Sequence, residues 1–146
     1  MEKQATYEDV NLILRLYEMR REEKLRKARG WFMQSYKVKS LAEHQALCTP
    51  GSDADAYFRM VVTYWDMVAS FITAGVLHPE LFFQSGNEML FTWERAKDTI
   101  QPWRDAFGNS SLMRNLETVA AQQAAYMEKR SPGAYPAFSK RVRGES

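Results

Sequence analysis

His44 and Cys48 are residues whose types and spacing could do chemistry. They stand four positions apart on a predicted short helix, beside Glu43, and this spacing puts both side chains on one face. A structural zinc site needs four protein ligands, and the only other histidine, His78, is distant in the sequence. The sequence therefore predicts no metal site and no cofactor, and we expect both side chains to be ordinary surface or half-buried residues.

His78 is the second candidate, because Pro79 and Glu80 follow it at a predicted helix start. An imidazole and a carboxylate this close together could form an acid/base pair. A histidine directly before a proline at the first helical position is more often a helix cap. The sequence has no glycine-rich phosphate loop, nucleophile elbow or helical His/Glu metal motif, so it favours a protein that is not an enzyme.

Asp66 is the only charged residue between Met60 and Leu77, which is the most apolar segment of the chain. A buried carboxylate here would have a perturbed pKa and would be a candidate for a functional site. On a helical wheel Asp66 shares a narrow arc with Thr63 and Ser70, which also fits a solvated polar stripe. A lipid-facing helix would not keep this stripe, since a carboxylate at mid-span costs on the order of 3 kcal/mol. We therefore expect a central core helix and no transmembrane span.

Trp93 and Trp103 lie in the stretch LFTWERAKDTIQPWRDAFG, residues 90–108, and each is followed within two positions by an arginine. With Arg104, Asp66 and His78 they could line a pocket between helices. The helical wheel favours packing in a core, because both tryptophans fall on one apolar stripe that also contains Ala96, Ile100 and Phe107. The opposite face of this helix, which we expect to meet solvent, carries Glu94, Arg95, Asp98 and Asp105.

A block of basic residues runs from Met19 to Arg29, and its six bases are Arg20, Arg21, Lys24, Arg26, Lys27 and Arg29. Glu22 and Glu23 are its only acids, so the block has a local excess of positive charge that could meet phosphate or an acidic partner. It could equally be the solvated part of a long helix. Nucleic-acid binding through this block and the terminal KRVR run is an unlikely function, because no helix-turn-helix spacing, zinc finger or aromatic stacking platform accompanies them.

The chain has 146 residues, one cysteine and a net charge of only +2, and 45% of its residues are hydrophobic. This length and composition suit one globular domain that needs no disulfide. The N-terminal residues MEKQATYEDV are too acidic to resemble a signal peptide. We therefore expect a cytoplasmic protein.

Apolar residues recur at helical spacing along most of the chain and predict an all-α bundle of four main helices plus one or two short ones. A long N-terminal helix begins at Thr6, and its apolar positions extend to Phe32. A short helix follows SLAE (residues 40–43), a second long helix runs from Ser52 or Asp53 to Gly75, and HPEL (78–81) opens a short turn. We expect residues 1–130 to form one domain and 131–146 an extended tail. The predicted core contains Trp31, Trp65, Trp93, Trp103, Phe58, Phe71 and Phe107.

The order of features from Asp53 to Met127 resembles an uncharacterised bacterial family, the domain of unknown function DUF4760. The resemblance is carried by AYFRMVVTYWDMVASFITAGVLHPELFF, by TWERAKDTIQPWRDAFG with Trp93, Pro102 and Arg104, and by the leucine-bearing helix that follows. The resemblance implies an all-α body and brings no activity or catalytic residues. Members often have an N-terminal membrane helix, and this sequence departs from that pattern because residues 1–18 are too polar to span a membrane.

The sequence as a whole favours a non-enzymatic interaction or assembly module. Its long first helix predicts a homo-oligomer, most simply a dimer that packs along this helix. Two alternatives remain open. One is a small-molecule binder or enzyme with a pocket between helices, and the other is a protein that binds an anionic surface, nucleic acid or lipid, through the basic block.

Overall fold

The computed structural model describes residues 3–145 and confirms the all-α prediction, since no strand occurs in this part of the chain. The helices are α1 (Tyr7–Arg20), α2 (Glu23–Ser35), α3 (Leu41–Leu47), α4 (Asp53–Thr73), α5 (Pro79–Gln84), α6 (Glu88–Phe107), α7 (Arg114–Arg130) and α8 (Ala134–Arg143). Among the described residues, no helix is both long enough and apolar enough to cross a membrane.

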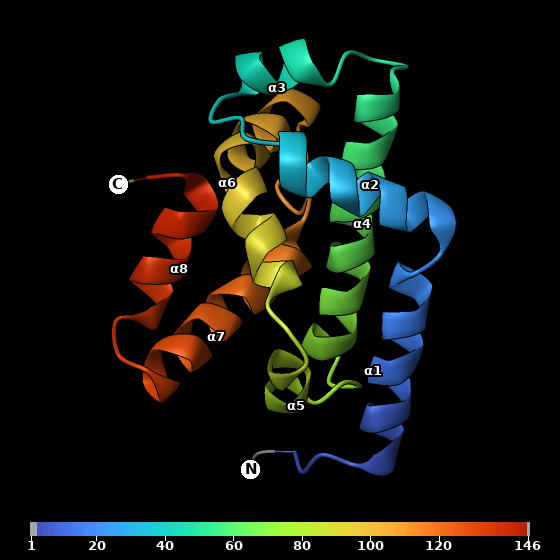
Figure 1. The fold of residues 1–146 in the computed structure, drawn as a ribbon, viewed down its shortest axis with the longest axis vertical. Helices are drawn as coiled ribbons and strands as arrows, with labels where there is room; N and C mark the ends of the chain where they lie inside the picture. Colours follow the sequence, from blue (N-terminus) through green and yellow to red (C-terminus); the bar gives the residue numbers. More distant parts are fainter. Residues whose placement is uncertain (1–2, 146) are drawn as a thin grey trace.

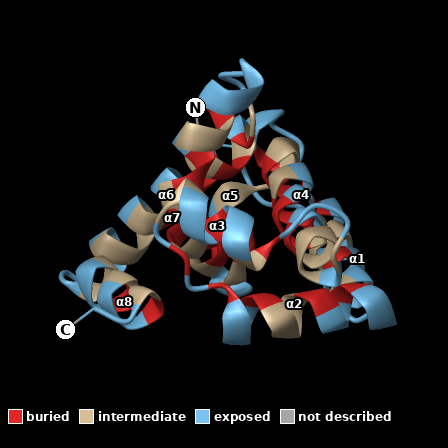
Figure 2. Cartoon of the chain, turned by 90° about the horizontal axis from the view of Figure 1, so that it is seen from above, coloured by how far each residue is buried: buried red, intermediate tan, exposed pale blue. Residues whose placement is uncertain are grey.

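Helix α4 is the centre of the core. It packs against α7 and against α2, which crosses it at a steep angle (Figure 1). One wide face of α4 is apolar and buried, and it consists of Phe58, Val61, Val62, Trp65, Val68, Ala69 and Ile72. Figure 2 shows that the buried residues of α2 and α4 lie on the inward sides of these helices. Ser52 caps the start of α4, and Gly75 adopts a left-handed conformation just beyond its end, as the sequence predicts.

The predicted long N-terminal helix is instead two helices, α1 and α2, that meet at Arg21 and Glu22. Glu22 has an extended ψ of 139°, and its carboxylate accepts hydrogen bonds from the backbone N–H groups of Lys24 and Leu25, so it caps a new helix. The apolar stripe of the sequence is interrupted by basic residues at this point. The change of direction lets Leu16 of α1 and Phe32 of α2 both reach the core, which a straight helix would not allow.

The short helices begin where the sequence predicts. The hydroxyl of Ser40 accepts a hydrogen bond from the N–H of Glu43 at the start of α3. His78 caps α5, with Pro79 in the first helical position. The carboxylate of Asp9, which is buried in α1, accepts hydrogen bonds from the backbone N–H groups of Thr6 and His78, so it joins the beginning of α1 to the beginning of α5.

Residues expected to lie in an extended C-terminal tail form α8, which corrects that expectation. Gly133, with φ 89°, supplies the left-handed turn into the helix. Pro136 lies in the first turn, where its missing N–H breaks no helical hydrogen bond. The helix buries Phe138 and Val142 against Leu90 of α6 and Ala120 of α7. The signal for this helix is present in the sequence, because Tyr135, Phe138 and Val142 follow helical spacing.

The predicted core list is right for Phe58 and Trp65, which are buried. Trp31, Phe71, Trp93 and Trp103 are half-buried and pack against the same core. The prediction that Phe107 belongs to the core is wrong, since this side chain is 66% exposed in the last position of α6. The helix ends at Gly108, so no further turn extends the core to meet this ring.

Candidate functional sites

Trp93 and Trp103 contribute to packing. Both contact the main hydrophobic core, and neither lines the cleft of about 500 Å³ beside His78. The ring of Trp103 lies against His44 and Phe58, with centroid separations of 5.6 and 5.4 Å. Aromatic pairs at such distances add to the stabilisation from burial alone. The two rings and the arginines that follow them are therefore not brought together around one cavity.

His44 and Cys48 are both buried, which corrects the expectation that they are surface or half-buried residues. His44 Nδ1 pairs with the hydroxyl of Tyr36 at 2.9 Å, and Tyr36 also pairs with Thr99 at 3.1 Å. Burial lowers the pKa of His44 and raises the pKa of the Cys48 thiol to about 11. No group of three potential metal ligands occurs among the described residues. The arrangement is a polar network inside the core.

Asp66 and Arg104 both hold the connection between α6 and α7. The first residues of α7 have no capping side chain of their own, and Asp66 Oδ1 instead accepts a hydrogen bond from the backbone N–H of Leu116 at 2.9 Å. Arg104 is buried, and it donates to the carbonyl of Leu112 at 2.8 Å and to Glu117 at 3.0 Å. Oδ1 of Asp66 and the guanidinium of Arg104 are thus engaged in contacts within the fold.

His78 borders a cleft of about 500 Å³ between the end of α4, α5 and α7. His78 Nδ1 accepts a hydrogen bond from the backbone N–H of Leu81, and so the proton of the neutral ring is on Nε2. The cleft has an apolar lining that includes Ile72, Leu77, Phe83 and Ala125, and a polar rim that includes Lys3, Glu80, Gln122, Tyr126 and Lys129. An apolar hollow with a few polar groups is the usual form of a small-molecule site.

The basic block does not form one continuous surface. Arg29 donates two hydrogen bonds of 2.6 Å to Glu88, and Arg20 lies 3.8 Å from the same carboxylate and over the ring of Trp65. These two cations join the junction of α1 and α2 to the start of α6. The remaining bases are exposed, namely Arg21, Lys24, Arg26 and Lys27. The block is therefore partly structural and partly solvated.

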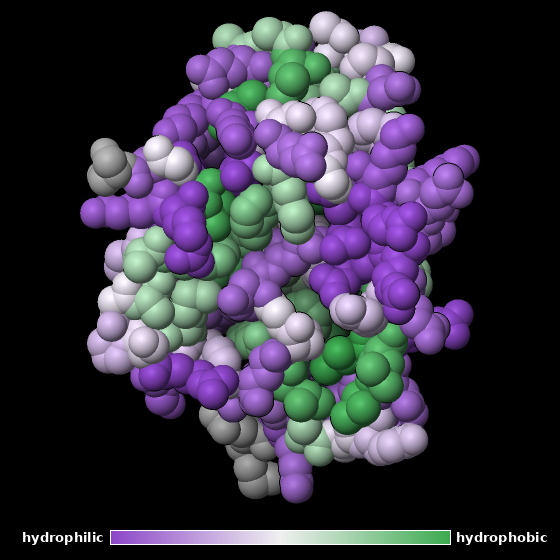
Figure 3. All heavy atoms as spheres, in the orientation of Figure 1, coloured by the Kyte–Doolittle hydropathy of each residue, from purple (hydrophilic) through white to green (hydrophobic). Residues whose placement is uncertain are grey.

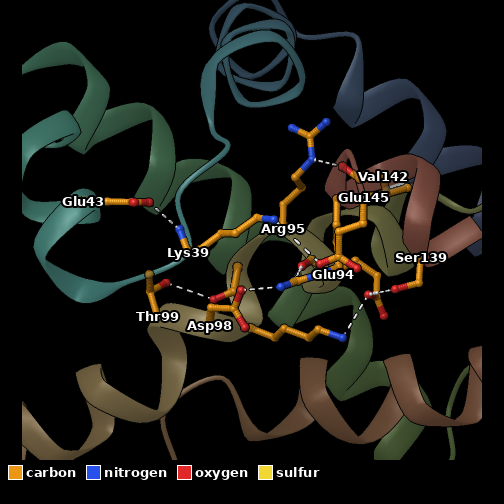
Figure 4. Close-up of polar contacts among 12 residues, drawn as sticks. Lys39, Glu43, Glu94, Arg95, Asp98, Thr99, Ser139, Val142 and Glu145 are labelled. Carbon is orange, nitrogen blue, oxygen red and sulfur yellow. Dashed lines mark hydrogen bonds and ion pairs between the residues drawn. The ribbon is translucent and has the colours of Figure 1, made fainter.

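Sequence analysis missed a polar cluster between α6 and α8, shown in Figure 4. The carboxylate of Glu94, predicted to face solvent, is fully buried and accepts hydrogen bonds from the hydroxyls of Tyr135 and Ser139. Lys97 lies 3.0 Å from it. The face of α6 that carries Glu94 is polar because α8 covers it with hydrogen-bond donors. A prediction of α8 would have shown that this polar face has a partner.

The outer face of α1 is apolar and uncovered. Tyr7 is 78% exposed, Leu14 is 57% exposed and Tyr17 is 52% exposed, and Val10 lies between them. These four residues recur at intervals of three and four, so they form one stripe along the helix. A shallow groove joins this stripe to Leu81 of α5. Figure 3 shows the resulting hydrophobic patch over α1 and α5.

The model of one protein family, the domain of unknown function DUF4760, matches residues 5–123. The chain belongs to this family. The match confirms the resemblance seen between Asp53 and Met127 and extends it over α1 to α3. No curated protein and no solved structure matches the chain. The DUF4760 match ends inside α7, so α8 and the residues with which it covers Glu94 lie beyond it.

Proposed function

We propose that this DUF4760 protein is an interaction module that pairs with a second copy of itself through the outer face of α1. The observation that carries the proposal is the stripe of Tyr7, Val10, Leu14 and Tyr17, whose side chains are exposed along one side of the helix. A contiguous exposed patch of this kind on a globular protein is typical of an interaction surface.

The sequence of α1 favours a second copy in antiparallel orientation. With Leu14 at the two-fold axis, Tyr7 of one copy lies opposite Arg21 of the other, so a guanidinium can rest on an aromatic ring at each end. Glu18 of one copy lies close to Asn11 of the other, which can donate a hydrogen bond to it. This orientation places no like charges directly opposite each other. The dipoles of the two α1 helices point in opposite directions, which is favourable.

The contact surface is small, because it consists of one face of a helix of 14 residues and the groove beside it. Interfaces at the low end of the size range form weak or transient complexes. We therefore expect a dimer that dissociates on dilution. The fold supports such a surface, since Asp9 holds the beginning of α1 to α5 and Arg29 donates a hydrogen bond to the carbonyl of Arg20 at its other end.

Sedimentation velocity over a wide range of protein concentration tests the proposal. The wild-type protein should shift from monomer to dimer as its concentration rises. Leu14→Glu places two like charges at the two-fold axis and should weaken the dimer on the order of tenfold or more. Phe107→Glu is the matched control, since Phe107 is equally exposed but lies on α6, and it should associate as the wild type does. A monomer at every concentration would show that the proposal is wrong.

The cleft beside His78 supports a second candidate, a binder of small amphipathic molecules. Its volume of about 500 Å³ and apolar lining suit such a ligand, and the Nε2–H of His78 and the hydroxyl of Tyr126 are suited to hold a polar group. Ala125→Trp would fill the cleft, whereas Ala121→Trp, one turn earlier on α7, would not. Binding of anilinonaphthalene sulfonate that is lost only in Ala125→Trp supports this candidate, and equal binding by both variants contradicts it.

A further inference from the structure

A small depression of about 140 Å³ lies where three distant parts of the chain meet. These parts are the α2–α3 connection at residues 37–39, α6 at Glu94 and Arg95, and the end of α8 at residues 141–144. Figure 4 shows Lys39, Glu94, Arg95 and Val142 gathered around this place. Helix α8, which forms one wall of the depression, lies on the side of the fold opposite to α1 (Figure 1).

The lining of the depression is strongly cationic. It contains one acid, Glu94, and five bases, which are Lys37, Lys39, Arg95, Arg141 and Arg143. Glu94 is already held by Tyr135, Ser139 and Lys97. The other acids of the network, Asp98 and Glu145, pair with Arg143 at 2.5 and 3.0 Å. Glu43 also belongs to this group, since its carboxylate accepts a hydrogen bond from the backbone N–H of Lys39 at 2.8 Å. When these three acids and Lys97 are included, an excess of two positive charges remains.

Arg95 is the most informative of these bases. Its Nε donates to the carbonyl of Val142 at 2.5 Å, and its Nη1 donates to the carbonyls of Tyr36 and Met33 at 2.9 and 3.2 Å. Within residues 3–145 no carboxylate lies within ion-pair distance of it, and its Nη2 has no hydrogen-bond partner. Burial lowers the pKa of Arg95. The guanidinium also lies over the ring of Phe91, 4.6 Å from its centroid. Its partners in the described part of the chain are thus carbonyls and an aromatic ring, and this partly buried cation lacks a counter-ion.

Lys37 and Arg141 complete the group of available donors. Neither forms an ion pair within the described part of the chain, and the guanidinium of Arg141 lies over the ring of Phe138 with 5.6 Å to its centroid. Lys39 is only loosely engaged, 3.7 Å from Glu145. Two guanidinium groups and two ammonium groups on three chain segments can therefore surround an anion that enters the depression.

We propose that this depression binds the phosphoryl group of a small phosphorylated molecule. A dianion neutralises this excess of two positive charges, whereas a single carboxylate leaves one positive charge uncompensated. Guanidinium groups match the oxygens of a phosphoryl group with paired hydrogen bonds. The volume of about 140 Å³ holds one such group, so the remainder of the ligand stays at the surface. Binding would also fasten α8 to the α2–α3 connection.

Calorimetric titration with inorganic phosphate at constant ionic strength tests this inference. Two variants of identical composition change are compared with the wild type. Lys37→Gln/Arg141→Gln removes two cations from the depression, and Arg26→Gln/Lys140→Gln removes two exposed cations that do not line it. All four residues are exposed, so we expect both variants to fold as the wild type does. Circular dichroism of each variant checks this.

The expected result is that phosphate binds the wild type and the Arg26/Lys140 variant equally. The Lys37/Arg141 variant should bind it on the order of tenfold to a hundredfold more weakly, since each lost charge-assisted hydrogen bond costs about a factor of ten. Three results would overturn the proposal: no binding by any of the proteins, equal weakening in both variants, or acetate binding as tightly as phosphate.

Discussion

The hydroxyl of Tyr135 donates a hydrogen bond to the buried carboxylate of Glu94 and thereby joins α8 to α6. The carboxylate also accepts a hydrogen bond from the hydroxyl of Ser139 and lies 3.0 Å from Lys97, so one acceptor group serves three side chains. Each partner is a polar group that loses its contact if the carboxylate is removed.

Glu94→Ala should therefore destabilise the protein by about 2–4 kcal/mol, because it leaves the half-buried donors Tyr135, Ser139 and Lys97 without their acceptor. Tyr135→Phe should cost only about 1 kcal/mol, since Ser139 and Lys97 still hold the carboxylate. Urea unfolding followed by circular dichroism measures both. Asp105→Ala, at an exposed acid of the same helix, should change stability little. If Glu94→Ala is no less stable than this control, the cluster does not hold α8.

Arg29 and Lys27 are neighbours in the basic block with different roles. Arg29 makes two hydrogen bonds to Glu88 and a third to the carbonyl of Arg20, whereas Lys27 is exposed. Arg29→Ala should lower stability by about 2–3 kcal/mol, since it leaves Glu88 half-buried with only the distant Arg20 as partner. Lys27→Ala should stay within about 0.5 kcal/mol of the wild type. Equal losses in a thermal unfolding experiment would show that the pairing is unimportant.

Most of the helix starts could be predicted from the sequence because local capping chemistry determines them. Ser40, Ser52 and the pair His78–Pro79 all begin helices where their residue types indicate. The break between α1 and α2 at Glu22 could not be predicted from capping residues. A helix of alternating charges is locally acceptable at that point, and only the need to bury both Leu16 and Phe32 decides the change of direction.

The burial of Glu94 shows why the candidate sites were harder to predict. A polar helix face has the same periodicity whether it meets water or a second helix that carries hydrogen-bond donors. The helical wheel for α6 separates the polar face from the apolar face correctly. It wrongly assigns Glu94 on the polar face to solvent, because the sequence analysis does not predict α8. Asp66 on α4 and Arg104 on α6 are a similar case, since their partners Leu116 and Glu117 belong to α7. A wheel of a single helix does not include them, and tertiary packing decides these contacts.

Stability should fall as the solution becomes mildly acidic, because His44 is buried in its neutral form. Burial lowers its pKa in the folded state below the ordinary value of 6.5, and the nearby Asp55 only partly opposes this. Between the two pKa values the unfolded chain therefore binds more protons than the folded chain. The contribution of His44 to the free energy of unfolding is complete above pH 6.5 and is lost as the pH falls below that value. His44→Phe should flatten this part of the stability profile, while Tyr36 keeps Thr99 as a partner. An unchanged profile in the variant would contradict this role.

Stability should also fall at high pH. Burial raises the pKa of Tyr64 to about 12, and burial together with the contact to Glu94 raises that of Tyr135 to about 12. A raised pKa in the folded state means that the stabilisation is complete below the ordinary value of 10 and is lost as the pH rises toward 12. Unfolding followed by tyrosinate absorbance should show a cooperative transition in this range. Tyr64→Phe should reduce the pH dependence, and an identical curve would count against it.

Disulfide formation in the variant Leu14→Cys tests the central proposal, self-pairing through α1, most directly. An antiparallel dimer with Leu14 on its two-fold axis brings the two new thiols together, whereas Phe107→Cys places its equally exposed thiol outside the contact. The native Cys48 is buried, so it does not compete. The account predicts that mild oxidation converts Leu14→Cys, but not Phe107→Cys, to a covalent dimer on a non-reducing gel. Equal amounts of covalent dimer from the two variants, or none from either, would contradict it.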